Sequence, residues 1–159
     1  MITKIIETLN DRFEEELATK SSYYDDDLVD TIVLREINQK DPTPTIGFLV
    51  GEARPKDYEV GIHYPATWVQ PLQVQIFVKH MSREEGFALI RTLVRRTMLC
   101  LFRDETKSEI LTSDSMGVLT ERVNKYNITG KAYSFGGASG SFAFGAAINM
   151  EFEIEMIIH

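Results

Sequence analysis

The carboxylates near the C-terminus are the first residues whose types and spacing suggest chemistry. In the stretch INMEFEIEMII, residues 148–158, Glu151, Glu153 and Glu155 occupy every second position. Catalysis by paired carboxylates needs two environments that separate two pKa values, and three like residues equally spaced along one strand do not indicate such a pair. Two interpretations remain open. The glutamates form either the solvated face of a half-buried strand or a surface that must not bind an anionic partner.

An acidic cluster and a glycine-rich stretch each lack part of the pattern that their chemistry requires. Asp25, Asp26 and Asp27 could ligate calcium, but they lack the spaced oxygen ligands and the turn glycine of an EF-hand loop. The stretch FGGASGSFAFG, residues 135–145, lacks the lysine and Ser/Thr of a phosphate-binding loop and the GxSxG context of a nucleophile elbow. We therefore expect a solvated loop at the first position and a hairpin tip at the second.

The histidines and the single cysteine also fail to form a reactive set. His63, His80 and His159 are far apart, each without a neighbouring His, Cys or carboxylate at metal-ligand spacing. Cys100 lies in an apolar helical pattern, which indicates a buried thiol rather than a nucleophile. Because it is the single cysteine of the sequence, an internal disulfide is excluded. Without a convergent acid, base and nucleophile, we predict a protein that is not an enzyme and uses no cofactor or metal.

Composition predicts one soluble domain. The chain has 159 residues, of which 43% are hydrophobic, enough for a single core over residues 1–159. Its 17 basic and 24 acidic residues give a net charge of -7. This balance argues against a protein that coats DNA or RNA, because such binding depends on Lys and Arg neutralising phosphates. No apolar run is long enough for a signal peptide or a membrane span, so we expect no membrane partner.

Two amphipathic helices are predicted. In the first, apolar residues recur at helical spacing at positions 2, 5, 6, 9, 13 and 17, opposite a mostly acidic side. The second lies in MSREEGFALIRTLVRRTMLCLF, residues 81–102, where Ser82 and Glu85 form a capping box ahead of an apolar stripe. Its outer side carries Arg91 and Arg95 four residues apart, a pair that is either solvated or faces an acidic neighbour.

Strands account for most of the remaining chain. Short strands are predicted at 31–37, 46–50, 58–64 and 72–79, with loops at 38–45 and 65–71 and no element assigned to 104–117. A long hairpin arm follows around 119–158. Its aromatic residues, Tyr133 and Phe135 before the tip and Phe142 and Phe144 after it, fall on one face as cross-strand pairs. The predicted fold is α+β, a mainly antiparallel sheet packed against two helices, with a long C-terminal β-hairpin.

Three stretches resemble the tail terminator family of long-tailed bacteriophages, also described as tail completion or neck proteins. They are MITKIIETLNDRFEEEL, PLQVQIFVKHMSREEGFALIRTLVRRTMLCLF and FAFGAAINMEFEIEMII. The resemblance implies a small subunit that assembles into a ring, commonly a homohexamer, capping the tail tube where it meets the head. The implied partners are further copies of itself, the tail tube protein and the head-tail connector or stopper protein. The implied location is the virion, after assembly in the host cytoplasm, with DNA passing through without specific binding.

The resemblance also implies roles for particular residues. Glu151, Glu153 and Glu155 are expected to face the ring axis and repel the phosphates of passing DNA, because a basic lumen would hold them. Contacts between subunits are expected from the aromatic hairpin and from the basic side of the second helix. The residues concerned are Tyr133, Phe135, Phe142, Phe144, Arg91 and Arg95.

Other functions remain open. A head-completion or stopper protein of the phage neck would share the ring and differ in its neighbour. A cellular interaction or ligand-binding module would place Trp68, Tyr64 and Phe77 around an apolar pocket. A metal-dependent hydrolase would use residues 25–27 or the glutamates of the C-terminal strand.

Overall fold

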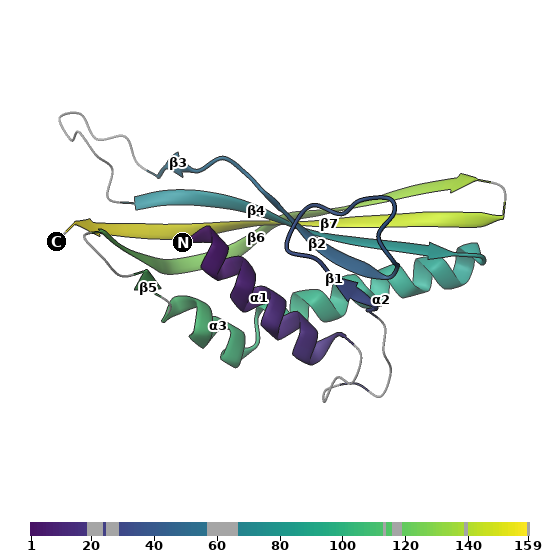
Figure 1. Ribbon diagram of the computed structural model, residues 1–159, viewed down its shortest axis with the longest axis horizontal. Helices are drawn as coiled ribbons and strands as arrows, with labels where there is room; N and C mark the ends of the chain where they lie inside the picture. The colour runs from purple at the N-terminus through teal and green to yellow at the C-terminus, as the bar shows by residue number, and fades with distance from the viewer. Residues whose placement is uncertain are drawn as a thin grey trace.

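The computed structural model describes residues 1–18, 24, 29–56, 67–112, 114–115, 119–138 and 140–158. It confirms the α+β fold, because within these residues a seven-stranded sheet carries three helices on one face (Figure 1). In chain order the elements are α1 (Ile2–Glu16), β1 (Thr31–Ile32), β2 (Thr45–Val50), β3 (Arg54–Pro55), β4 (Thr67–His80), α2 (Arg83–Leu101), α3 (Asp104–Leu111), β5 (Asp114–Ser115), β6 (Leu119–Ala138) and β7 (Ser141–Ile158).

Strand β7 has paired neighbours on both sides in a mainly antiparallel sheet. The strand order is β1-β2-β4-β7-β6-β5, and β3 pairs with β4 beyond the end of β2. β7 pairs with β4 from Phe142 to Glu155 and with β6 from Ser141 to Ile158. The predicted hairpin is thus present as β6 and β7. It is joined to the sheet almost to its tip, because β4 accompanies β7 as far as Phe142 (Figure 1).

The alternation of side chains along β4 and β7 builds the core. Even-numbered side chains of both strands point towards the helices and are buried, from Gln70 to Val78 in β4 and from Phe144 to Ile154 in β7. Burying a side chain of this size contributes about 1.5–3 kcal/mol. The helices add further buried side chains three or four positions apart, among them Ile5, Leu9 and Phe13 of α1 and Ile90, Leu93 and Val94 of α2.

The predicted start of the second helix is confirmed. Ser82 is the N-cap of α2, and its side chain accepts a hydrogen bond from the backbone N–H of Glu85. The prediction of two helices is wrong, because residues 104–111 form α3. This short helix buries Thr106 and Ile110 and packs against α1 and β6.

Two strand boundaries also differ from the prediction. Of residues 31–37 only Thr31 and Ile32 form β1, although the chain beyond them still covers the edge of β2 through hydrogen bonds from the N–H of Val33 and to the carbonyl of Arg35. β4 begins at Thr67, inside the predicted loop 65–71. Pro71 fits this strand because its carbonyl faces Gly51, so its missing N–H points to the side where β2 has ended. The predicted strand at 58–64 and the acidic cluster 25–27 lie outside the described residues.

Helix α2 approaches β7 closely at Gly86. A Cβ atom there would lie 2.1 Å from Cε2 of Phe144, a fully buried side chain. We expect Gly86→Ala to lower the free energy of unfolding by roughly 1–3 kcal/mol, as overpacking does, although alanine favours a helix by about 1 kcal/mol. Urea denaturation measures the change. Gly136→Ala in β6, where no heavy atom lies within 4 Å of the added Cβ, is the control. Equal stability of the two variants would contradict the steric argument.

Candidate functional site

The glutamates of β7 lie on the open face of the sheet, which is the face opposite the helices. Phe152 and Ile154 are buried beneath the helices, so Glu151, Glu153 and Glu155 share the other side of the strand. This confirms the predicted alternation of the two faces. Their cross-strand neighbours in β6 are Asn127, Lys125 and Arg122.

Basic side chains of the same chain accompany these glutamates. Nη2 of Arg54 lies 2.8 Å from Oε1 of Glu151. Oε2 of Glu153 lies 3.0 Å from Nζ of Lys56 and 3.4 Å from Nζ of Lys125. Four cations thus accompany the three carboxylates of β7, which the spacing of the glutamates alone did not predict. We call this group the charged patch, and its residues are Arg54, Lys56, Arg122, Lys125, Glu151, Glu153 and Glu155.

The topology of the sheet explains why sequence reasoning missed these cations. Arg54 belongs to β3, and Lys56 follows it; both reach β7 from the far side of β4, close to a hundred positions away along the chain. Lys125 and Arg122 stand directly opposite the glutamates within the hairpin. The basic residues of ERVNK, aligned across the hairpin with EFEIE, are the signal that could have found this second pair.

Glu153 has the most constrained carboxylate of the charged patch. Its side chain is 14% exposed. Partial burial acts to raise its pKa, but hydrogen bonds from Lys56 and Lys125 outweigh burial, so the pKa of Glu153 lies below its usual value. The carboxylate is thus held ionised, as a structural ion pair rather than as a proton donor.

The open face changes character along β7 towards the hairpin tip. Next to the charged patch, Nε2 of Gln75 donates to Oε1 of Gln73 at 3.0 Å, and Nε2 of Gln73 donates to Oδ1 of Asn149 at 3.0 Å. Beyond these amides the surface carries only small residues in the two hairpin strands, namely Ala147, Gly145 and Ala143 of β7 and Ala132, Ser134 and Gly136 of β6. The face passes from paired charges to neutral amides to small, uncharged side chains.

The three phenylalanines nearest the hairpin tip lie on the helix side and form one cluster with Phe87 of α2. Phe135 stacks on Phe87 with ring centroids 5.5 Å apart and lies 6.0 Å from Phe142, while Phe144 meets Phe87 edge-on at 4.8 Å. Their predicted common face is confirmed, with Phe135 directly opposite Phe144. Phe144 is fully buried within its own chain, so it is removed from the candidate subunit contacts. Tyr133 and Phe135 remain about half exposed.

A groove runs between α2 and β6 on the helix side of the molecule. Its volume is about 820 Å³, and we call it the α2–β6 groove. Both predicted arginines, Arg91 and Arg95, line it from α2, and Lys131 lines it with Tyr133 from β6. Its remaining lining is Val94, Met98, Leu99, Phe102, Arg103, Asp104 and Glu105. A basic and apolar groove of this kind suits an acidic amphipathic partner.

The outer edge of β6 borders this groove and carries few pairing partners. β5 pairs only with Glu121 and Arg122, and none of the described strands pairs with the outer edge of β6 from residue 125 to 138. Residues 131–137 are all exposed. The β6–β7 ladder is irregular before Gly130 and regular from there to Ala138. A long, regular and exposed edge is a surface on which other chains add a strand.

The remaining candidates for chemistry are held in structural contacts. Cys100 is buried, and both burial and the charge of nearby Glu16 raise its pKa, so the group is a thiol. Nδ1 of His80 accepts a hydrogen bond from the backbone N–H of Ser82 at 2.9 Å. Among the described residues no group of three or more His, Cys, Asp and Glu side chains could hold a metal ion. His63, His159 and residues 25–27 lie outside that part of the chain.

Over the part of the chain that the structure describes, no helix is long and apolar enough to cross a membrane. The chain matches no protein-family model, and it matches none of the curated proteins. The distinctive surfaces of this α+β protein are therefore the charged patch, the α2–β6 groove and the edge of β6.

The ion pairs of Glu153 give the stability a defined pH dependence. Because its pKa is lowered in the folded protein, its contribution is present above the unfolded value of about 4.3 and is lost as pH falls through the folded value. We expect Glu153→Gln to lower the free energy of unfolding by roughly 1–2 kcal/mol at pH 7, and by less as the pH falls through the lowered pKa of Glu153. Urea titrations at several pH values measure this. Glu36→Gln, at an exposed position, is the control. A loss of unfolding free energy in Glu153→Gln that stays constant with pH would contradict a stabilising role for the ion pairs of Glu153.

Proposed function

We propose that this protein is a ring-forming tail terminator of a long-tailed bacteriophage, which caps the tail tube and forms the joint to the head while DNA passes through. The observation that carries the proposal is the exposed outer edge of β6 beside the α2–β6 groove. Exposed aromatic side chains, an open strand edge and a groove lie together over residues 131–137 and the outer side of α2. A monomer would leave this surface uncovered, whereas a subunit of a ring buries it against its neighbour.

The charged patch offers a physical reason why DNA could pass without being bound, and this reason is charge compensation rather than acidic repulsion alone. Arg54, Lys56, Arg122 and Lys125 alone would form a basic surface, which holds phosphates by counterion release. The three glutamates of β7 offset most of that positive charge. The overall charge of -7 adds a weak general repulsion. A ring with this face towards its axis would let DNA slide without binding it.

Two alternative functions make different demands on the same surfaces. A stopper protein of the neck would use the same ring and bind the portal ring rather than the tail tube. A cellular ligand-binding module would need one apolar pocket lined by Trp68 and Phe77. Phe77 lines a shallow hollow of about 340 Å³ on the open face, whereas Trp68 lines a different one with Met1 and Ile154, so the two residues share no described pocket. Tyr64 lies outside the described residues.

The proposed function is tested by imaging the assembly. We expect the purified protein to form closed rings with a central hole in negative stain, with a matching mass by light scattering, and to bind the ends of purified tail tubes. Portal rings, offered separately, are the control that distinguishes a terminator from a stopper. Protein that stays monomeric at every concentration and also fails to bind tube ends would refute the proposal.

The glutamates are tested by removing their charge alone. We expect the triple variant Glu151→Gln, Glu153→Gln, Glu155→Gln to bind double-stranded DNA more tightly than the wild type, with an affinity that falls steeply as salt rises. Phage carrying it should eject DNA more slowly although its tails assemble. Glu36→Gln, Glu52→Gln, Glu84→Gln removes three exposed carboxylates elsewhere and is the control. Unchanged DNA binding and ejection in the first variant would leave the glutamates with a structural role alone.

A further inference from the structure

The cations of the α2–β6 groove are arranged for an acidic helix. Arg91 and Arg95 are exposed one turn apart on α2, about 6 Å along its axis, and Lys131 is exposed on β6 across the groove. Leu99 and Phe102 add exposed apolar surface, at 50% and 37%. Asp104 and Glu105 of α3 also line the groove.

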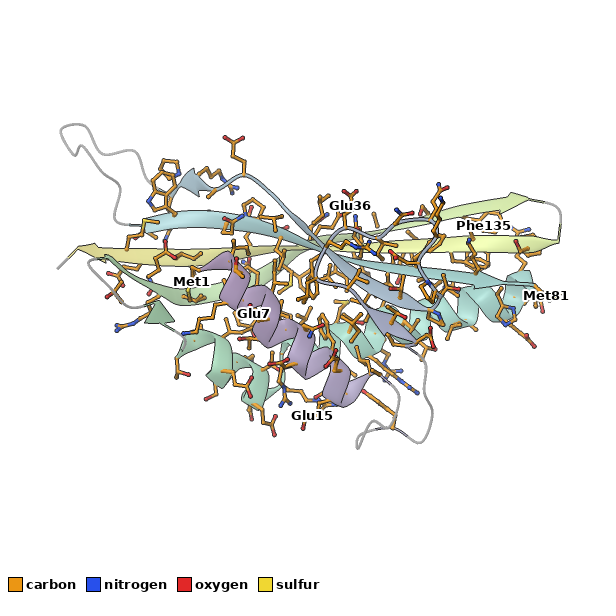
Figure 2. All side chains as sticks on the ribbon, in the orientation of Figure 1. Met1, Glu7, Glu15, Glu36, Met81 and Phe135 are labelled. Atoms are coloured by element: carbon orange, nitrogen blue, oxygen red, sulfur yellow. The ribbon has the colours of Figure 1, made fainter. Side chains whose placement is uncertain are left out.

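Helix α1 carries a matching acidic surface on its outer side. Glu7, Asp11 and Glu14 are exposed at intervals of four and three residues, which places them in one row along the helix. We call them the acidic stripe. The opposite side of α1 is buried in the core, and in Figure 2 Glu15 lies on the side of this helix turned away from the sheet. Lys4 is the one exposed cation of α1.

The stripe and the groove occupy different parts of one molecule. The stripe belongs to α1, whereas the groove is lined by α2, β6 and the start of α3. In Figure 2 Met1, at the start of α1, and Phe135, beyond the groove in β6, lie towards opposite ends of the long axis. A contact between the stripe of one copy and the groove of another is heterologous when it is made once per pair of copies. Such contacts repeat head to tail and close into a ring when the rotation permits.

The opposite edge of the sheet, at β2, is not open to a strand from a neighbouring copy. The edge of β2 is covered by its own chain, because the N–H of Val33 donates to the carbonyl of Ile46 and the N–H of Phe48 donates to the carbonyl of Arg35. A neighbour cannot extend the sheet from β2 to the exposed edge of β6 without displacing this segment. The charged helix surfaces are thus the complementary pair that the described residues offer.

We propose that the α2–β6 groove binds the acidic stripe of α1 from a second copy of this chain. The inference rests on the self-assembly in the proposed function and names the surfaces through which it takes place. The arginine pair, one helical turn apart, faces stripe carboxylates at the same spacing. Tyr133, Leu99 and Phe102 cover the uncharged parts of the incoming helix.

The test exchanges charges between the two surfaces of the full-length chain. The groove variant carries Arg91→Glu and Arg95→Glu, and the stripe variant carries Glu7→Lys and Asp11→Lys. We expect each variant alone to lose self-association by roughly 100-fold or more, because like charges then face each other. An equimolar mixture should associate again, since every groove then meets an oppositely charged stripe in an alternating ring. Sedimentation velocity measures association, and circular dichroism checks folding.

Two controls separate this result from general charge effects. Lys40→Glu with Lys79→Glu changes the net charge as much as the groove variant does, at exposed positions outside the groove, and should associate like the wild type. The chain carrying all four groove and stripe substitutions should associate on its own. Association that returns in the equimolar mixture or in the four-substitution chain requires folded protein, so misfolding of the two variants cannot explain that result.

Several results would overturn the inference. One is wild-type protein that stays monomeric at every concentration. Another is a pair of variants that associate as the wild type does, as expected if two β6 edges paired about a two-fold axis. The third is a mixture that stays dissociated. The proposed function fails separately. Rings that persist in both variants and still bind tube ends would refute the binding of the acidic stripe in the α2–β6 groove. They would leave the tail terminator proposal intact.

Discussion

The double pairing of β7 is the interaction on which the rest of the structure depends. With β4 on one side and β6 on the other, its register is fixed from both directions, so its even-numbered residues face the helices and its odd-numbered residues face away. A slip of one position would place Glu153 under the helices and expose Phe152. The dry core, the charged patch and the position of the aromatic cluster all follow from this one register.

Apolar packing holds the helix layer on that sheet, and a buried ionic cluster links the helices to one another. The carboxylate of Glu16 is fully buried and contacts the guanidinium groups of Arg12 and Arg103, so it links α1 to the junction of α2 and α3. A buried ion pair adds little net stability over apolar packing, but losing one partner leaves charge unpaired. The cluster therefore favours one placement of α1, with its apolar side inward and the acidic stripe outward.

Much of the fold could be predicted because its signals are local and periodic. The alternation in β4 and β7, the helical spacing of α1 and the capping serine of α2 each depend on neighbours within a few residues. The missed features depend on distant contacts or short elements. Eight residues of α3 give too few turns for a clear period, and Arg54 meets Glu151 only because β3 pairs with β4. Phe87 could not be assigned to the aromatic cluster without the path of α2 over β7.

The distribution of charge makes the two proposals compatible in one ring. The acidic stripe and the α2–β6 groove lie on the helix side, whereas the charged patch lies on the open face of the sheet, where its cations and carboxylates accompany each other. Contacts between copies through the helix side leave the open face uncovered. A face that is neither strongly acidic nor strongly basic is suited to lie near DNA without retaining it. The same sheet thus separates the surface that binds neighbours from the surface that must not bind.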